Sequence, residues 1–190
     1  MQPSKSELDS PEDLLSLLES RGGDSYFGEP VTVLEHSLQA AHFAREMHCS
    51  NALIAAALLH DIGHLLHREE EDIADQGVDT RHEVLADELL SRHLPPAVTM
   101  PIRLHVAAKR YLCYADIAYR EALSPSSLLS LGLQGGPMTD QEAKAFLAGP
   151  FARDAISLRR WDDEAKIPDL PMPSLPSYLP LLNGLWHVAG

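Results

Sequence analysis

The sequence has few basic residues for its length. Fifteen lysines and arginines stand against 28 aspartates and glutamates, which gives 190 residues a formal net charge of −13. Because nucleic-acid phosphates are bound by basic surfaces, this balance argues against a nucleic-acid partner. No uncharged apolar run reaches the roughly 18 residues that a membrane-spanning helix needs, so we also expect no membrane partner. The pattern indicates no particular oligomeric state.

Cysteines and export signals are scarce as well. The two cysteines, Cys49 and Cys113, lie far apart, and neither has a second cysteine at metal-ligand spacing. The N-terminal stretch MQPSKSELDSPEDLL is polar and acidic and lacks the apolar segment of a secretory signal. We therefore expect free thiols rather than a disulfide, and a cytoplasmic location.

Alternating strand patterns are missing, and helix signals dominate the chain. Ser10 and Pro11, followed by two acidic residues, are typical of a helix start, and apolar residues recur at helical spacing through much of the sequence. A chain of this length suits one domain, so we predict an all-α, bundle-like domain over residues 1–190, with a helical core at about 10–166 and a proline-rich, extended C-terminal wrap over 167–190. The expected helices cover about 10–20, 33–47, 51–66, 80–93, a segment starting near 101, a short piece of 124–138, 140–147 and 151–162.

The stretch LLHDIGH at residues 58–64 is the most unusual feature of these helices. It places His60 and Asp61 side by side in an apolar run, where ionisable groups are costly unless they are paired or bound to metal. Other helices carry polar residues in similar apolar contexts, and four imidazoles and two carboxylates from five helices suit divalent iron, manganese or zinc. These six candidate ligands are His36, His60, Asp61, His82, His105 and Asp162.

The spacing of His60 and His64 also resembles a pair of zinc ligands on one face of a metalloprotease helix. That motif requires a glutamate directly after the first histidine, and Asp61 stands there. The metalloprotease interpretation is therefore rejected.

The pair His60-Asp61, with histidines upstream and downstream, resembles the HD-domain superfamily, whose members are mostly metal-dependent phosphohydrolases. The similarity is closer to a small branch of it. The motifs YFGE (26–29), LEHSLQ (34–39), LLHDIGH (58–64), HVAAKRYL (105–112), LQGGPM (133–138) and RRWDD (159–163) resemble the PhnZ family of mixed-valence diiron oxygenases. This resemblance runs from about residue 10 to residue 166.

The resemblance implies two iron ions as a mixed-valence Fe(II)/Fe(III) pair, with O2 as co-substrate. One iron would be held by His36, His60, Asp61 and Asp162. Asp61 would bridge to a second iron, held also by His82 and His105.

The resemblance also implies roles for residues around the metals. Tyr26 would occupy an iron position before substrate arrives, and Glu29 would bind a substrate amine. The residues matching phosphonate ligands are His64, Lys109 and Ser127, with Ser126 as the neighbouring alternative. Arg159 falls at a matching arginine that would also serve the substrate.

The expected activity is O2-dependent cleavage of a carbon–phosphorus bond in a small-molecule phosphonate. We expect (1R)-2-amino-1-hydroxyethylphosphonate to give glycine and phosphate, or, as the alternative, its trimethylammonium analogue to give glycine betaine and phosphate. The alternatives from other classes are a metal-dependent HD phosphohydrolase and a non-catalytic HD module that binds a metabolite. Six candidate ligands and the YFGE motif favour the oxygenase.

Overall fold

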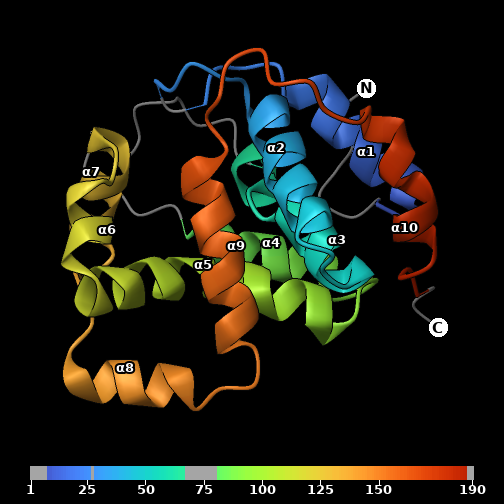
Figure 1. Ribbon diagram of the computed structural model, residues 1–190. Coiled ribbons are helices and arrows are strands. Elements are labelled where there is room, and N and C mark those ends of the chain that lie inside the picture. Colours follow the sequence, from blue (N-terminus) through green and yellow to red (C-terminus); the bar gives the residue numbers. More distant parts are fainter. Residues whose placement is uncertain (1–7, 27, 67–80, 188–190) are drawn as a thin grey trace.

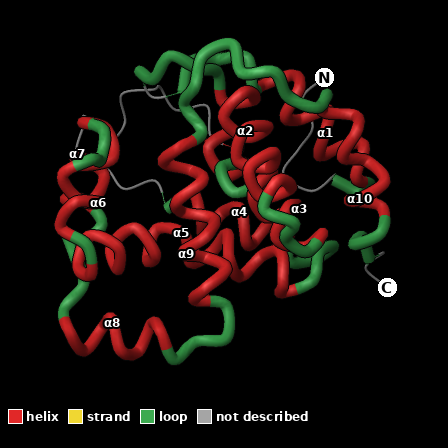
Figure 2. Tube along the Cα trace, in the orientation of Figure 1, coloured by secondary structure: helices red, strands yellow, loops and turns green. Residues whose placement is uncertain are grey.

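A computed structural model describes residues 8–26, 28–66 and 81–187 (Figure 1). Within these ranges every regular element is a helix, which confirms the all-α prediction (Figure 2). No helix in the described part of the chain is long and apolar enough to cross a membrane. The elements are α1 (Pro11–Arg21), α2 (Val33–Glu46), α3 (Asn51–Leu59), the 3-10 helix η1 (Ile62–Leu66), α4 (His82–Leu90), α5 (Pro96–Ala115), α6 (Ile117–Glu121), α7 (Pro125–Leu133), α8 (Asp140–Leu147), α9 (Ala152–Glu164), the 3-10 helix η2 (Leu175–Tyr178) and α10 (Leu179–Asn183).

Helix α3 lies at the centre of the core. Its sequence, NALIAAALL, is apolar on every side, and all residues from Leu53 to Leu59 are buried. A helix that is hydrophobic all round has to be covered on all sides, and α2, α5 and α9 pack against it. Helix α9 crosses α5 (Figure 1), and α4 packs on α5 as well. These contacts bring the helices that carry the candidate metal ligands together around one core.

The start of α2 is set by local sequence. Thr32 caps the helix by accepting from the backbone N–H of Glu35, and the Glu35 carboxylate accepts in return from the backbone N–H of Thr32 at 2.7 Å. Such a reciprocal capping box satisfies backbone donors that would otherwise lack partners. It fixes His36 in the first turn of α2.

The third helix is shorter than predicted. A single helix over 51–66 was expected, but α3 ends at Leu59, His60 and Asp61 form a turn, and η1 follows. Gly63 shows why η1 sits so close to α4: a Cβ built on it would lie 2.0 Å from the His82 carbonyl oxygen. His60 and Asp61 therefore lie at a helix end rather than at a helix centre.

Two other boundaries differ from the prediction. The fifth helix was expected to start near Pro101, yet α5 begins at Pro96, where a proline's fixed φ and missing N–H are tolerated, and it runs on through Pro101. Helix α4 was expected over about 80–93; it covers His82–Leu90, and Thr80 lies outside the described residues. Helix α6 was not predicted at all.

The C-terminal segment is only partly extended. Residues 167–174 contain no helix but include a turn at Pro168 and Asp169. The extended prediction is wrong beyond them, because η2 and α10 follow. Leu175, Tyr178 and Leu182 are buried, and these two elements pack against α1, with α10 also contacting α3. Their apolar side chains complete the core. Cys49 and Cys113 are both free thiols, as expected.

Candidate metal centre and substrate site

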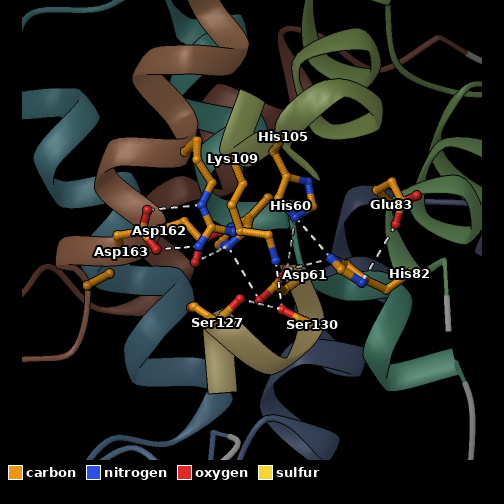
Figure 3. Close-up of polar contacts among 12 residues, drawn as sticks. His60, Asp61, His82, Glu83, His105, Lys109, Ser127, Ser130, Asp162 and Asp163 are labelled. Atoms are coloured by element: carbon orange, nitrogen blue, oxygen red, sulfur yellow. Dashed lines mark hydrogen bonds and ion pairs between the residues drawn. The ribbon is translucent and has the colours of Figure 1, made fainter. Parts of the chain in front are cut away.

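Six buried polar side chains meet in the core. Helices α2, α4, α5 and α9 contribute one each, and the turn that ends α3 contributes the adjacent pair His60 and Asp61. Figure 3 labels all of them except the histidine of α2. Their exposure ranges from 0% for His36 and His60 to 8% for His82. They are the six predicted ligands, His36, His60, Asp61, His82, His105 and Asp162.

The first half of the cluster is formed by two imidazoles and two carboxylates. The Nε2 atoms of His36 and His60 lie 3.1 Å apart. Asp61 Oδ2 is 3.6 Å from His36 Nε2 and 3.4 Å from His60 Nε2. Asp162 Oδ1 lies 3.5 Å from His36 Nε2. His36, His60 and Asp61 thus form a group of suitable ligand atoms, all within 4.8 Å of one another, and Asp162 Oδ1 lies beside the two imidazoles.

The second half lies on the other side of Asp61. The Nε2 atoms of His82 and His105 are 3.0 Å apart. Asp61 Oδ1 is 3.6 Å from the first and 3.8 Å from the second. One carboxylate thus directs one oxygen toward each histidine pair, which is the arrangement of a bridging ligand.

The hydrogen bonds of the ring Nδ1 atoms show which nitrogens are available to a metal. His36 Nδ1 lies 2.9 Å from the Ala165 carbonyl oxygen, and His60 Nδ1 lies 2.9 Å from that of Ala57. His105 makes the same kind of bond to Ile102 at 2.7 Å. A carbonyl only accepts, so each Nδ1 carries the hydrogen and each Nε2 presents a lone pair. Burial also lowers the pKa of His36 and of His105 to about 4, so both rings are neutral at neutral pH.

This arrangement fits metal ions. Two neutral imidazoles that direct lone pairs at each other across about 3 Å repel, and a cation between them turns that repulsion into coordination. The second bond of each ring, to a backbone carbonyl, is the usual support of a metal-bound histidine. The donor set is nitrogen and carboxylate oxygen, with no thiolate among the described cluster, and suits iron, manganese or zinc.

Arg159 lies behind Asp162. Its Nη1 is 2.7 Å from Asp162 Oδ2, and its Nε donates to Asp163 Oδ2 at 3.0 Å; Nη2 also pairs with Asp163. Although burial acts to raise the pKa of Asp162, the Arg159 guanidinium holds that pKa well below its usual range. Asp162 therefore stays ionised, with Oδ2 bound to Arg159 and Oδ1 facing the histidines. The substrate role expected for Arg159 stays a prediction.

Tyr26 reaches the first half of the cluster from the loop before α2. Its hydroxyl donates to Asp61 Oδ2 at 2.8 Å and lies 3.4 Å from Asp162 Oδ1. Its ring stacks on His36, with ring centroids 3.8 Å apart. Burial and the two carboxylates raise the pKa of Tyr26 well above its ordinary value, so the hydroxyl keeps its proton.

Lys109 is a buried cation one turn after His105 on α5. It is 2% exposed, and its Nζ donates to Ser130 Oγ at 2.7 Å (Figure 3). Ser130 in turn donates to the Ser127 carbonyl at 3.1 Å. Burial and the neighbouring Arg159 lower the pKa of Lys109 to about 7. A buried ammonium that donates to a neutral hydroxyl group is suited to an anionic ligand.

The remaining predicted residues lie around this core. His64, on η1, stacks on His82 with ring centroids 3.9 Å apart. Glu29 forms an ion pair with Lys166 at 2.9 Å and accepts from Ser126 Oγ at 3.4 Å. The loop between Tyr26 and Glu29 is tight, because Glu29 N–H donates to the Tyr26 carbonyl at 2.8 Å and Gly28 has a φ of +73°.

Two residues of this region were missed by sequence reasoning. Ser130, rather than Ser127, presents its hydroxyl to Lys109; the three-residue spacing within SPSSLLS could have indicated it, because residues three apart share a helix face. Lys166 had no such signal, since its partner Glu29 lies 137 positions away.

Comparison with known proteins agrees with this geometry. The HD domain family matches residues 33–124. The chain is 47% identical over 159 residues to a hydroxymethylphosphonate dioxygenase of Gimesia maris, which covers 82% of this chain and 78% of the relative. It is 38% identical over 167 residues to the [1-hydroxy-2-(trimethylamino)ethyl]phosphonate dioxygenase (glycine-betaine-forming) of Leisingera caerulea, covering 88% of this chain and 85% of that one. An uncharacterized protein of Acanthamoeba polyphaga mimivirus is 35% identical over 156 residues, 81% of this chain and 71% of the relative.

Proposed function

Because the chain belongs to the PhnZ-type family of HD-domain phosphonate dioxygenases, we propose that it uses O2 to cleave the carbon–phosphorus bond of a 1-hydroxyphosphonate at a pair of iron ions. The observation that carries this proposal is the position of Asp61. Its two carboxylate oxygens lie within 3.8 Å of the Nε2 atoms of separate histidine pairs. A hydrolase with one metal has no need of the second pair.

The metal-binding roles follow from the two halves of the cluster. His36, His60, Asp61 and Asp162 would hold one iron, and Asp61, His82 and His105 the other. A mixed-valence Fe(II)/Fe(III) pair bound there would supply the redox chemistry that the use of O2 requires. Arg159 keeps Asp162 ionised and fixes its carboxylate, and the backbone carbonyl of Ala165 fixes the His36 ring.

The phosphonate would be bound by the cationic side of the site. Lys109 provides a buried ammonium on the same face of α5 as His105, and Ser130 holds that ammonium in place. His64 lies stacked against His82, where its ring can donate to a phosphonate oxygen. Ser127 and Ser130, of which only Ser127 was predicted from the sequence, offer hydroxyl groups from α7. These contacts would fix the substrate so that its hydroxyl-bearing carbon faces the metals.

Tyr26 and Glu29 would respond to substrate binding. The Tyr26 hydroxyl lies against two of the proposed ligands, Asp61 and Asp162, and so covers the first half of the cluster. Glu29 is joined to it by a backbone hydrogen bond within the same loop. Movement of Glu29 would therefore move Tyr26, and such a shift requires a substrate that binds the open state more tightly than the closed one.

Three substrates are candidates. A Glu29 carboxylate that is free to accept from a primary ammonium would favour (1R)-2-amino-1-hydroxyethylphosphonate, which would give glycine and phosphate. The trimethylammonium analogue, giving glycine betaine, would be attracted by charge alone. The 47% identity to the Gimesia maris enzyme favours hydroxymethylphosphonate.

The test measures O2 consumption and phosphate release by the purified, iron-loaded protein with each of the three phosphonates, in air and under nitrogen. We expect phosphate release that depends on O2 and is equal in amount to the O2 consumed. Phosphate release from a phosphate monoester without O2, and none from any phosphonate, would instead identify a phosphohydrolase.

A further inference from the structure

The Glu29 carboxylate is already occupied by a cation of the chain itself. Lys166 Nζ lies 2.9 Å from Glu29 Oε1, and the two side chains are only 15% and 16% exposed. Lys166 also donates to Ser124 Oγ at 3.3 Å, and Ser126 Oγ donates to Glu29 Oε1 at 3.4 Å. The carboxylate of Glu29, on the loop that carries Tyr26, is thus neutralised by Lys166 and also contacts a serine hydroxyl group.

Lys166 is held in position by its neighbours in sequence. The Ala165 carbonyl accepts from His36 Nδ1 at 2.9 Å. On the other side, Ile167 N–H donates to Gln39 Oε1 at 3.0 Å, and Gln39 Nε2 donates to the Ile167 carbonyl at 2.8 Å. An exposed ion pair between two flexible chains contributes little, but this lysine extends from a backbone that is fixed to α2 on both sides. Its ammonium is therefore presented to Glu29 at a set distance.

The same ammonium competes with any cationic group of a substrate. A primary amine on a substrate would make with Glu29 the contact that Lys166 Nζ makes now, a charge-assisted hydrogen bond of 2.9 Å. The substrate named for the Leisingera relative carries a quaternary ammonium, and that named for the Gimesia relative carries no cation. A site in which a lysine of the chain itself neutralises the carboxylate is suited to a substrate without a cationic group.

We infer that Lys166 is a specificity-determining residue: by neutralising Glu29 it directs the site to 1-hydroxyphosphonates without a cationic group, of which hydroxymethylphosphonate is the smallest. This inference rests on the proposed function and deepens it by naming the substrate. In the net reaction the C–P bond breaks, carbon and phosphorus together give four electrons to O2, and each gains one oxygen atom. Hydroxymethylphosphonate dianion and O2 thus become formate and dihydrogen phosphate.

The test compares substrate preference before and after the lysine charge is removed. The ratio of kcat/KM for 2-amino-1-hydroxyethylphosphonate to that for hydroxymethylphosphonate should be below one in the wild type. In Lys166→Gln it should rise about tenfold or more, because the freed carboxylate can bind the amine. The double variant Glu29→Gln/Lys166→Gln should lose this gain, and Lys166→Arg should keep the wild-type preference. Lys144→Gln is the matched control, since it removes an exposed lysine paired with Asp140 on α8.

A binding measurement separates this inference from the proposed function. Calorimetry under nitrogen with 2-aminoethylphosphonate, which has no hydroxyl group to be oxidised, should show about tenfold tighter binding to Lys166→Gln than to wild type, and no such gain in the double variant. An unchanged ratio and unchanged affinity would overturn the inference, as would a wild type that prefers the amino substrate. If no phosphonate supports O2 consumption, the proposed function fails, while the affinities still decide whether Lys166 blocks an amine.

Discussion

The Tyr26 hydroxyl donates its hydrogen bond to Asp61 Oδ2, the same oxygen that lies 3.4 Å from His60 Nε2. A loop residue thus contacts the proposed bridging ligand on the side where one metal would be bound. We expect a side chain in that place to limit the access of O2 until substrate arrives.

Replacing Tyr26 by phenylalanine removes the hydroxyl and keeps the ring that stacks on His36. We expect the reduced, iron-loaded variant to be oxidised faster by O2 in the absence of substrate, with little loss of iron. Stopped-flow absorbance of the reduced protein mixed with oxygenated buffer, with and without substrate, measures this. Equal rates for Tyr26→Phe and wild type would reduce Tyr26 to a packing residue of the loop.

Metal content tests the role of Asp61. We predict two irons per chain in protein expressed with iron, and loss of both in Asp61→Ala, because its two oxygens face both histidine pairs. Asp87→Ala is the control; it removes a carboxylate that pairs with Arg103 at 3.2 Å instead. Elemental analysis of folded protein gives the number of irons per chain. At most one metal per fully loaded wild-type chain contradicts the dinuclear assignment.

Removal of the Lys109 ammonium should weaken substrate binding. A charge-assisted contact to a buried cation contributes roughly 1.5–3 kcal/mol, so Lys109→Ala should raise KM by about ten- to a hundred-fold and lower kcat as well. Lys144→Ala, on the exposed surface of α8, should leave both constants unchanged. Steady-state O2 consumption measures the effect, and unaltered kinetics of Lys109→Ala would exclude Lys109 from the phosphonate site.

Substrate binding should also depend on pH through the same group. Burial and Arg159 lower the pKa of Lys109 to about 7, so the free protein loses this positive charge as the pH rises through that value. We expect KM to increase above pH 7 in the wild type. Lys109→Arg, which stays charged, should show a much flatter profile. Identical pH profiles of the two proteins would show that another group controls binding.

Gly63 tests the packing that brings His82 to the cluster. A Cβ at this position would lie 2.0 Å from the His82 carbonyl oxygen, so Gly63→Ala should lower the free energy of unfolding by about 1–3 kcal/mol and reduce metal content. Gly132→Ala is the control, because nothing lies within 4 Å of its Cβ in α7 and alanine favours a helix by roughly 0.5–1 kcal/mol. Urea unfolding monitored by circular dichroism measures the free energy of unfolding of both variants. A Gly63→Ala protein as stable as Gly132→Ala would mean that η1 and α4 can separate without cost.

Much of the fold could be predicted because its signals are local. Capping residues mark the starts of α1, α2 and α8. Apolar spacing indicated α9 without a side-chain cap, and polar residues within apolar helices stood out as candidate ligands. Boundaries set by tertiary contacts could not be predicted in this way. Gly63, shortly after the end of α3, lies against the backbone of α4, and η2 and α10 pack on α1. These contacts join segments that are far apart in the sequence.

The substrate side of the site was harder to predict for a related reason. Lys109 carries its own signal, a cation one turn from a candidate ligand, but its partner Ser130 comes from α7 and depends on how α7 packs. The pairing of Glu29 with Lys166 depends on the path of the chain after α9. The spacing of Ser127 and Ser130 indicates that they share a helix face, but the partners that Ser130 and Lys166 contact are revealed only by the folded structure.

The Ala165 carbonyl links the metal centre to the end of the chain. It accepts the hydrogen bond that fixes the His36 ring, and the next residues lead into η2 and α10, which cover α1. By thermodynamic linkage, whatever stabilises the oriented ring also stabilises this stretch. We expect amide hydrogen exchange over residues 175–183 to slow when metal binds, so that the C-terminal helices report the occupancy of a centre they do not touch.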